Sequence, residues 1–459
     1  MIRPILLTVL LVAPTASATD VTPELKAGVD RIIASAMSGN NAFTRLTELC
    51  DDIGARLSGS TELEKAVVWA LDVLKKDGHE NVRGEKVMVP KWVRGDESLE
   101  MVLPRRQRFS ILGLGGSVGT PGITAEVVVA NDEEDLKRLG DKVKGRIVLF
   151  NNAMPPFHPV HGTHYGKTVR FRVHGARLAA KQGAVAVLVR SVTAMSLYTA
   201  HTGVMKYGDA PVKIPAAAVT VEDADLMARL ITRKRSVKVT LKMEAKDHGL
   251  VESANVVAEL RGRENPEEIV VIGGHLDSWD VGTGAHDDGS GCLMAMEALS
   301  VLRRLGMRPR RTIRVVLFTN EENGLRGGKQ YREDHAADMK HHVAAIEADS
   351  GSFQPRGFRL DIKDQARSEK SLKRLQALVG LLGATGASET RASFAGADIS
   401  PMKKDGVALL GLWMDRSKYF NVHHTRADTI DKIDPELLDK NVAMMAAIAW
   451  LLAEMPARL

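Results

Sequence analysis

Hydrophobic residues recur with two different spacings along this chain. Short, nearly continuous apolar runs, such as residues 269–272 and 313–318, are typical of strands buried on both faces. Longer segments carry apolar residues at helical spacing, and residues 435–455 are the clearest case. Strands that alternate with helices from Asn255 onward predict an α/β domain with a mostly parallel, doubly wound sheet.

A different pattern occupies the middle of the chain. Short apolar strands at residues 123–129 and 147–150 alternate there with turns rich in glycine and proline, and one helix is predicted at residues 176–182, ended by Gly183. We therefore expect a β-rich domain inserted into the main one. The predicted division is a signal peptide at 1–18, the N-terminal part of the main domain at 19–105, the insert at 106–246 and the catalytic part at 247–459.

The first residues have the features of a cleavable export signal. Arg3 precedes an apolar stretch at residues 5–12, and residues 16–18 (Ala-Ser-Ala) match the small residues found before a cleavage point. The apolar stretch is too short to cross a bilayer as a helix. We expect a protein without a membrane anchor that is exported to the periplasm or the extracellular space, or is lysosomal or secreted if its source is eukaryotic. After the signal, residues 42–76 predict two helical pieces, the second capped by Ser60.

Composition narrows the classes of function. At 459 residues the chain is longer than one hydrophobic core supports, which agrees with two domains. The formal net charge is +6, but the basic residues are scattered and no nucleic-acid-binding motif is present, so nucleic acid is not an expected partner. Only Cys50 and Cys292 are present, which excludes a disulfide scaffold. One bridge between them stays open, and a buried free thiol is the expected state of Cys292.

Side chains that can bind metal follow several of the apolar runs. In an open α/β sheet, ligands bind beyond the carboxyl ends of the strands, where these side chains would meet. The set combines two imidazoles with three carboxylates: His275, Asp287, Glu322, Asp349 and His424. Nitrogen and oxygen donors in this mixture suit zinc, with cobalt or manganese as substitutes. A catalytic zinc usually takes three protein ligands, so the set predicts two Zn²⁺ per chain if one carboxylate bridges them.

Two further acidic residues have expected roles beside these donors. Glu321 adjoins Glu322, and neighbouring residues on an extended segment point in opposite directions. Glu321 is therefore a candidate general base for a metal-activated water. Asp277 follows His275 by two residues and is suited to hold the second nitrogen of that ring.

The order of motifs H-x-D, D-D-G-S-G, E-E, D-S-G and H-H-T-x-x-D-T resembles that of peptidase family M28, and residues 275–288 carry the most specific part of the resemblance. The similarity covers nearly the whole chain after the signal, including residues 53–60 and an insert similar to a protease-associated (PA) domain. It implies a sheet of the zinc exopeptidase type (phosphorylase/hydrolase-like). It also implies that Asp287 bridges two metals, with Glu322 and His424 completing one site and His275 and Asp349 the other. In the same way it implies that Glu321 is the base and that Asp277 orients His275. Finally, it implies a cis peptide between Asp287 and Asp288.

The resemblance also suggests residues that contact the substrate. It selects His424 over His423 as the ligand, and His423 is then a candidate donor to the tetrahedral oxyanion. Asp398 lies in a segment similar to one that lines the cleft in the family, where it can meet a substrate amine. Arg391 is a candidate partner for a free carboxylate. The expected partners are short peptides, and a homodimer is compatible with the family.

These features predict an exported binuclear zinc exopeptidase that acts on short peptides or dipeptides. An aminopeptidase with the same metals stays an alternative, since that preference depends on the loops of the cleft. A non-catalytic, receptor-like relative would lack the donors that are present here, and a glutaminyl cyclase would hold a single zinc.

Two other motifs are interpreted as structural. Residues 115–119 match the G-x-S-x-G nucleophile elbow, but residues 120–122 (Thr-Pro-Gly) favour a turn where that motif needs a helix. His158, His161 and His164 lie among prolines and glycines without an acidic neighbour, which predicts a solvated loop beside the cleft and not a third metal site.

Overall fold

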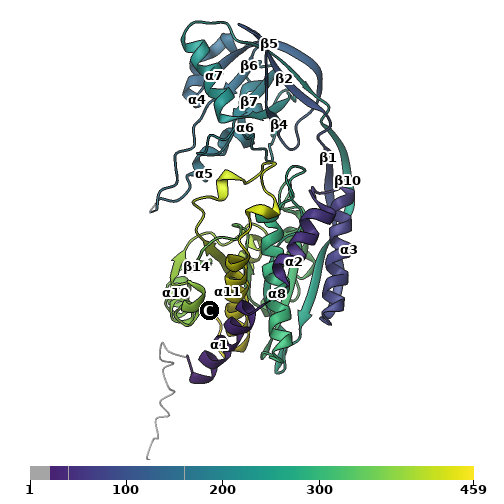
Figure 1. The fold of residues 1–459 in the computed structure, drawn as a ribbon, viewed down its shortest axis with the longest axis vertical. Coiled ribbons are helices and arrows are strands. Elements are labelled where there is room, and N and C mark those ends of the chain that lie inside the picture. Colours follow the sequence, from purple (N-terminus) through teal and green to yellow (C-terminus); the bar gives the residue numbers. More distant parts are fainter. Residues whose placement is uncertain (1–20, 40, 160) are drawn as a thin grey trace, which may run out of the picture.

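The computed structural model describes residues 21–39, 41–159 and 161–459. Its described strands form two eight-stranded sheets, one in each half of an elongated molecule (Figure 1). The predicted signal peptide at residues 1–18 lies outside the described residues. Among the helices that the structure describes, none combines the length and the apolar character needed to cross a membrane.

The main sheet has the strand order β1-β10-β12-β11-β13-β16-β14-β15. Its central strands are parallel to one another: β12 (Arg311–Phe318), β11 (Asn265–His275), β13 (His342–Glu347) and β16 (Ala408–Met414). The outer strands are β1 (Glu80–Val93), β10 (Lys246–Leu260), β14 (Pro355–Asp361) and β15 (Glu389–Ala392). The α/β class is therefore confirmed. The parallel part begins at β11 and not at Asn255, because Asn255 lies in β10, which runs antiparallel to β12.

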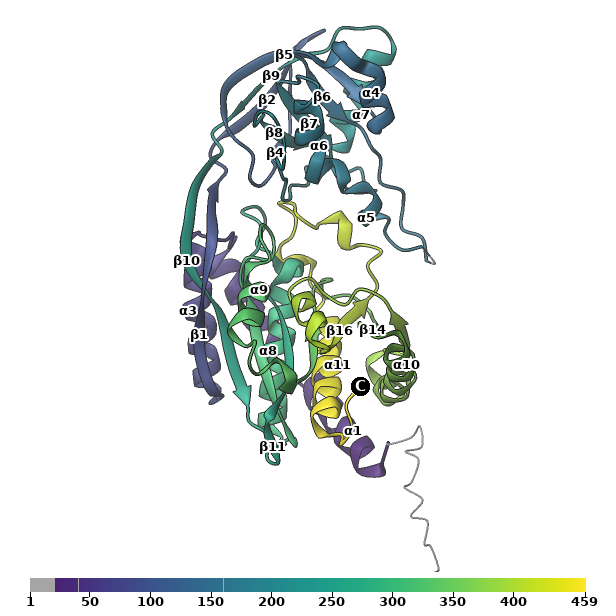
Figure 2. The same cartoon turned by 180° about the vertical axis from the view of Figure 1, so that it is seen from behind.

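Helices cover both faces of the main sheet, as a doubly wound fold requires. One face carries α1 (Pro23–Met37), α2 (Ala42–Thr47), α3 (Thr61–Lys76), α8 (Ser290–Arg304), α10 (Gln365–Val379) and α11 (Pro435–Glu454). The opposite face carries α9 (Arg326–Asp334), which packs through Tyr331 (Figure 2). Ser60 accepts a hydrogen bond from the Leu63 amide, so the predicted N-cap of α3 is confirmed. Short helical turns complete this domain: η1 (Glu48–Ile53), η3 (Ala285–Gly289), η4 (Met339–His341), η5 (Gly380–Thr385), η6 (Ser400–Asp405), η7 (Tyr419–Asn421) and η8 (Ile430–Lys432).

The second sheet has the strand order β3-β2-β9-β5-β6-β7-β8-β4. Its strands are β2 (Glu97–Leu103), β3 (Gln107–Phe109), β4 (Ile111–Gly113), β5 (Thr120–Ala130), β6 (Ile147–Phe150), β7 (Ala186–Arg190), β8 (Ala216–Val219) and β9 (Lys238–Met243). The helices beside it are α4 (Glu133–Leu139), η2 (Gly140–Val143), α5 (Tyr165–Thr168), α6 (Arg170–Ala180) and α7 (Val221–Thr232). The sheet thus starts with β2, before the predicted insert boundary at residue 106. Helix α6 starts earlier than the predicted 176.

The antiparallel pair β1 and β10 connects the two sheets, because the chain enters the insert through β1 and returns through β10 (Figure 1). The central strands of the main sheet run toward the insert, so the loops at their carboxyl ends lie on the side of the second sheet (Figure 2). In both views the segment between β16 and α11 also rises toward the insert. The residues predicted to bind metal are in these loops.

Candidate metal centre

The five predicted metal donors converge beyond the carboxyl ends of the parallel strands. His275 ends β11, Asp287 lies in η3 before α8, Glu322 follows β12, Asp349 follows β13, and His424 follows η7. All are buried except Asp349, which is partly exposed. Since segments far apart in the sequence deliver them to one place, the predicted convergence of the five side chains is what the structure shows.

Asp287 stands between the two histidines and turns one oxygen to each. Its Oδ1 is 3.3 Å from Nε2 of His275, and its Oδ2 is 3.3 Å from Nε2 of His424. Around His275, the Asp349 Oδ1 lies at 3.9 Å, and around His424, the Glu322 Oε2 lies at 3.0 Å. The donors therefore divide into two groups of three that share Asp287. A cis peptide joins Asp287 to Asp288, as the resemblance implies.

The donor atoms fit divalent cations. Oδ2 of Asp287 and Oε1 of Glu322 are buried and have no hydrogen-bond partner. A buried carboxylate oxygen without a partner is costly, and a cation held by these oxygens and the nearby imidazoles would satisfy it. Imidazole nitrogen together with carboxylate oxygen is a donor set that suits zinc.

Burial and charge oppose each other at these residues. Burial disfavours the ionised form of Asp287, but contacts with His275 and His424 hold its pKa well below the usual range. Burial also opposes protonation of the two rings, yet Asp287 and the other carboxylates raise the pKa of His275 and His424 well above the usual value. For Glu322, burial raises the pKa to about 6. The negative charge of the buried carboxylates therefore favours the binding of cations at this site.

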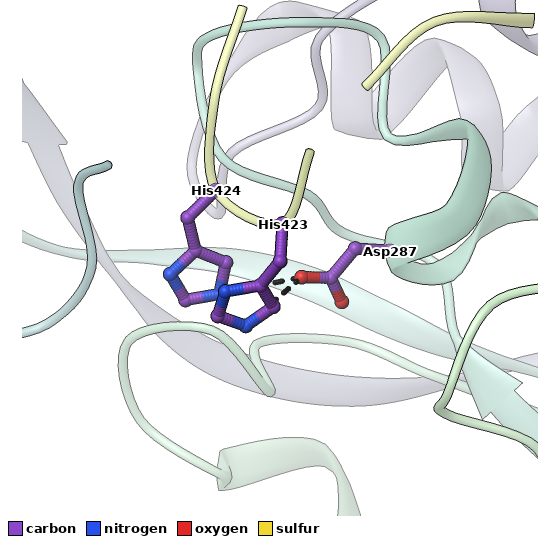
Figure 3. A group of neighbouring side chains, drawn as sticks. All are labelled: Asp287, His423 and His424. Carbon is purple, nitrogen blue, oxygen red and sulfur yellow. Dashed lines mark ion pairs between the residues drawn. The ribbon is translucent and has the colours of Figure 1, made fainter. Parts of the chain in front are cut away.

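His423 lies beside His424 and presents a second candidate nitrogen. The two rings stack with centroids 3.6 Å apart, and Nε2 of His423 is 3.6 Å from Oδ2 of Asp287 (Figure 3). The atoms of Asp287, His423 and His424 are close enough together to share one ion. Only His424, however, also makes a close contact with Glu322.

Asp277 contacts both His275 and the neighbouring glutamates. Nδ1 of His275 is 2.9 Å from the main-chain carbonyl of Asp277 and 3.7 Å from its carboxylate. The carboxylate also accepts hydrogen bonds from the main-chain amides of Glu321 and Glu322 and from the Ser58 hydroxyl. The Asp277 carboxylate therefore lies within ion-pair distance of the ring, while its hydrogen bonds fix the two adjacent glutamates, and its role in orienting His275 stays a prediction.

Two residues that support the centre were not singled out from the sequence. The carboxylate of Asp428 accepts hydrogen bonds from the amides of His286 and Asp287, at 2.8 and 3.0 Å, and so fixes the backbone of the shared aspartate. The fully buried Arg56 donates to the carbonyls of Leu276, Thr283 and Gly284. In the sequence, Asp428 is the aspartate of the motif H-H-T-x-x-D-T, and Arg56 lies in the early segment 53–60. Neither motif reveals what these side chains contact.

The insert contributes to the centre from the opposite side. Nδ1 of His424 lies 3.2 Å from the carbonyl of Thr202, and the amide of Thr202 donates to the carbonyl of His424 at 3.0 Å. Arg172 of α6 is also 3.2 Å from Nδ1 of His424. Trp279, whose ring is 5.6 Å from that of His424, packs on Gly115, where a Cβ would lie 2.0 Å from the indole. Gly115 therefore belongs to a domain contact, and the G-x-S-x-G match has no nucleophilic geometry: Ser117 accepts from the Ala216 amide and donates to the Val118 carbonyl.

A cavity of about 430 Å³ opens onto the donors. Glu321 and Asp349 line it from the main domain, and Tyr165 and Arg172 line it from the insert. Burial, reinforced by the neighbouring carboxylates, holds the pKa of Glu321 well above the usual range. A carboxyl group with a raised pKa beside the donors can take up a proton and release it again.

The two remaining substrate-binding candidates do not line this cavity. Asp398 is fully buried, and neither of its oxygens has a hydrogen-bond partner. Arg391 is exposed and lines a neighbouring cavity, together with His161 and His164. The contact of Asp398 with a substrate amine therefore stays a prediction, since the buried carboxylate is not among the residues that line the cavity.

Both cysteines are buried free thiols. Sγ of Cys292 donates to the carbonyl of His275 at 3.1 Å, and Sγ of Cys50 is 3.7 Å from the carbonyl of Thr283. The expected state of Cys292 is confirmed.

Known proteins resemble this chain over most of its length. The model of peptidase family M28 matches residues 255–449, and that of the PA domain matches residues 123–227. Carboxypeptidase Q of Mus musculus is 43% identical over 418 residues, and that of Homo sapiens is 40% identical over 420 residues; each alignment covers 91% of this chain and 86% of the relative. The crystal structure of a peptidase M28 precursor from Shewanella amazonensis SB2B has a TM-score of 0.90 at 35% identity and covers 95% of this chain and 98% of that one.

A zinc aminopeptidase from Bacillus subtilis shares the fold, with a TM-score of 0.65 at 19% identity and coverage of 91% of this chain and 96% of that one. Together these findings confirm the M28 resemblance and the zinc exopeptidase type of fold with a PA insert. The chain also resembles carboxypeptidase Q over most of its length.

Proposed function

The chain belongs to peptidase family M28 and is a metallopeptidase, and on this premise we propose that it is an exported binuclear zinc exopeptidase that hydrolyses dipeptides and other short peptides. The observation that carries the proposal is the position of Asp287, whose two oxygens face different histidines. Release of a C-terminal residue is the favoured reaction, because the relatives at 40–43% identity are carboxypeptidases.

We assign the donors to two cations that share Asp287. His275 and Asp349 would complete one site, and Glu322 and His424 the other, with zinc as the metal and cobalt or manganese as substitutes. His424 is preferred to His423 because it faces Glu322 as well as Asp287. When bound, such a pair polarises the scissile carbonyl and lowers the pKa of a water.

Glu321 is the proposed general base. It lines the cavity beside the donors, and its raised pKa suits a group that takes a proton from the attacking water and delivers it to the leaving nitrogen. The Asp277 carboxylate accepts hydrogen bonds from the amides of Glu321 and Glu322. It thereby fixes the position of the proposed base relative to the proposed metal donor. His423 lines the same cavity and is the proposed donor to the oxyanion.

The insert is proposed to cover the cleft and limit the length of the substrate. Tyr165 and Arg172 close one side of the cavity, and Tyr165 stacks on Phe420 of the main domain. We propose the division into main domain and insert near the limits of the second sheet, from β2 to β9. Export through the N-terminal signal and a homodimeric state remain proposals from the sequence.

The decisive experiment combines metal content with a Glu321→Gln variant. We expect two zinc ions per purified chain in both proteins. Loss of the base should lower kcat for an unblocked dipeptide by about 100- to 10,000-fold. Glu436→Gln, an exposed change of the same kind, serves as the control. One zinc per chain, or full activity of Glu321→Gln, would contradict the proposal.

Blocked substrates separate carboxypeptidase from aminopeptidase action. A carboxypeptidase should tolerate an N-acetyl group and lose activity on a C-terminal amide. The opposite preference would identify an aminopeptidase with the same metal centre.

A further inference from the structure

Two arginines stand at the border of the active-site cavity. Arg359 lies on β14 and Arg416 just after β16, and both line the cavity together with Glu321 and Asp349. Both also line a second cavity of about 740 Å³, so the two spaces adjoin at these guanidinium groups. A small peptide at the catalytic residues can therefore reach them.

Neither guanidinium has a hydrogen-bond or ion-pair partner. In the part of the chain that the structure describes, Arg359 and Arg416 make no side-chain hydrogen bond and no ion pair. The contrast is Arg356 on the same strand, which donates to Glu389 at 2.8 and 2.9 Å and stacks on Trp413. Arg359 stacks on the same indole, at 5.9 Å, but it forms no ion pair. The strand thus carries one paired and one unpaired arginine.

Like charges gather at this place. Burial, together with the nearby Arg416 and Arg391, lowers the pKa of Arg359 to about 9. Lys167 of the insert also lines the second cavity. Asp349 offsets these charges only in part, because it forms no ion pair with either arginine and is itself a proposed metal donor. Placing partly buried cations next to one another with so little counter-charge is unfavourable, and an anion bound between them would relieve it.

The chemistry of the pair favours a carboxylate. Guanidinium groups present parallel N–H donors that match the two oxygens of a carboxylate, and such charge-assisted hydrogen bonds are among the strongest in proteins. A peptide amine, in contrast, would be repelled by the same charges. A substrate that brings its own carboxylate to this border would be held with its amide bond within the catalytic cavity.

Resting on the proposed function, we infer that Arg359 and Arg416 bind a carboxylate of the peptide substrate and thereby determine which peptides are cleaved. This assigns to them the role that the sequence suggested for Arg391, which lines only the outer cavity. The carboxylate comes either from the C-terminus of the peptide or from an aspartate or glutamate side chain.

The test compares Arg359→Met and Arg416→Met with the wild type on four substrates: alanyl-alanine, its C-terminal amide, alanyl-glutamate and alanyl-glutamine. Loss of a charge-assisted hydrogen bond should lower kcat/KM by about 10- to 100-fold for substrates that use it. A loss on alanyl-alanine with the amide unaffected identifies the C-terminal carboxylate. A loss confined to alanyl-glutamate, with alanyl-glutamine unaffected, identifies the side chain. Equal losses on every substrate, or none, overturn the inference.

Controls separate binding from folding and from the proposed function. Arg356→Met removes the paired arginine from the same indole and should leave the relative kcat/KM values of the test substrates unchanged. Arg416→Lys should retain part of the kcat/KM that Arg416→Met loses. Calorimetric binding of alanyl-alanine and its amide to Glu321→Gln measures recognition without hydrolysis. A preference for the free carboxylate there, abolished by Arg359→Met, would support the inference even if the wild type proved not to be a peptidase. Equal binding of both ligands would refute it even in an active enzyme.

Discussion

The two halves of the candidate metal centre are anchored in different ways. The first half, His275 and Asp349, is held within the main domain: the His275 amide donates to the Asp288 carboxylate, and Nδ1 faces the Asp277 carbonyl. In the second half, Glu322 and His424, the histidine depends on the insert. The comparison teaches that an inserted domain can become part of a catalytic centre without providing a donor atom.

The backbone of His424 shows how far this dependence goes. Its φ is 60°, in the left-handed region that residues with a side chain rarely adopt. Such a conformation persists where its surroundings hold it, and here Thr202 of the insert contacts both the carbonyl and Nδ1 of His424. His275, at the end of a parallel strand, needs no such support. The second half should therefore respond to changes in the insert, and the first half should not.

The strongest test of the comparison removes one histidine at a time. His275→Asn and His424→Asn should each retain one zinc per chain, because Asp287 still offers an oxygen to the other half. Loss of one cation costs several kcal/mol of transition-state stabilisation, so hydrolysis should fall by about 1,000-fold or more in both. Metal analysis and dipeptide assays measure this. His423→Asn should keep two ions; if it loses one and His424→Asn does not, the assignment of the two histidines is reversed.

A smaller effect should follow from disturbing the insert alone. Gly115→Ala places a Cβ 2.0 Å from Trp279, so the segment that contacts His424 must shift. Loss of outer support typically weakens metal binding by about 10- to 100-fold, and we expect the lower value. Zinc titration should show the loss in the His275→Asn background, where only the second half remains. In the His424→Asn background the same change should have no effect.

Gly380→Ala, where a Cβ would meet nothing within 4 Å, is the control for both backgrounds. Equal weakening in the two backgrounds would mean that the insert supports the whole centre, and the difference between the halves would disappear.

The sequence revealed the first half of the centre better than the second. His275 and Asp349 follow apolar strands, and the carboxyl ends of neighbouring parallel strands must meet, so their proximity could be predicted. Nothing in the local sequence of Thr202 or Gly115 indicates a contact with His424, because that contact depends on how the two sheets are placed. The hydrogen bonds of the Asp277 carboxylate to the amides of Glu321 and Glu322 were missed for a similar reason, because the spacing to His275 predicts only the contact with that ring.

The last prediction concerns the stability of the fold in acid, where we expect no effect on the metal centre. It tests whether the scaffold and the metal site respond to pH independently. Burial lowers the pKa of His79 to about 4, although Asp77 opposes the shift, and Arg303 and Arg45 reinforce it. The folded chain therefore keeps His79 neutral between about pH 6.5 and pH 4, whereas the unfolded chain becomes protonated. The stability contributed by the neutral ring is fully present above pH 6.5 and is lost as the pH falls toward 4, by up to about 3 kcal/mol.

His79→Gln, which can keep the contact with Ser300, should reduce this loss of stability between pH 6.5 and pH 4, measured by urea unfolding of the metal-free protein. Exposed His248→Gln should leave the profile unchanged, and neither variant should shift the pH at which zinc is released. A shift in zinc release with His79→Gln would show that the scaffold and the centre titrate together.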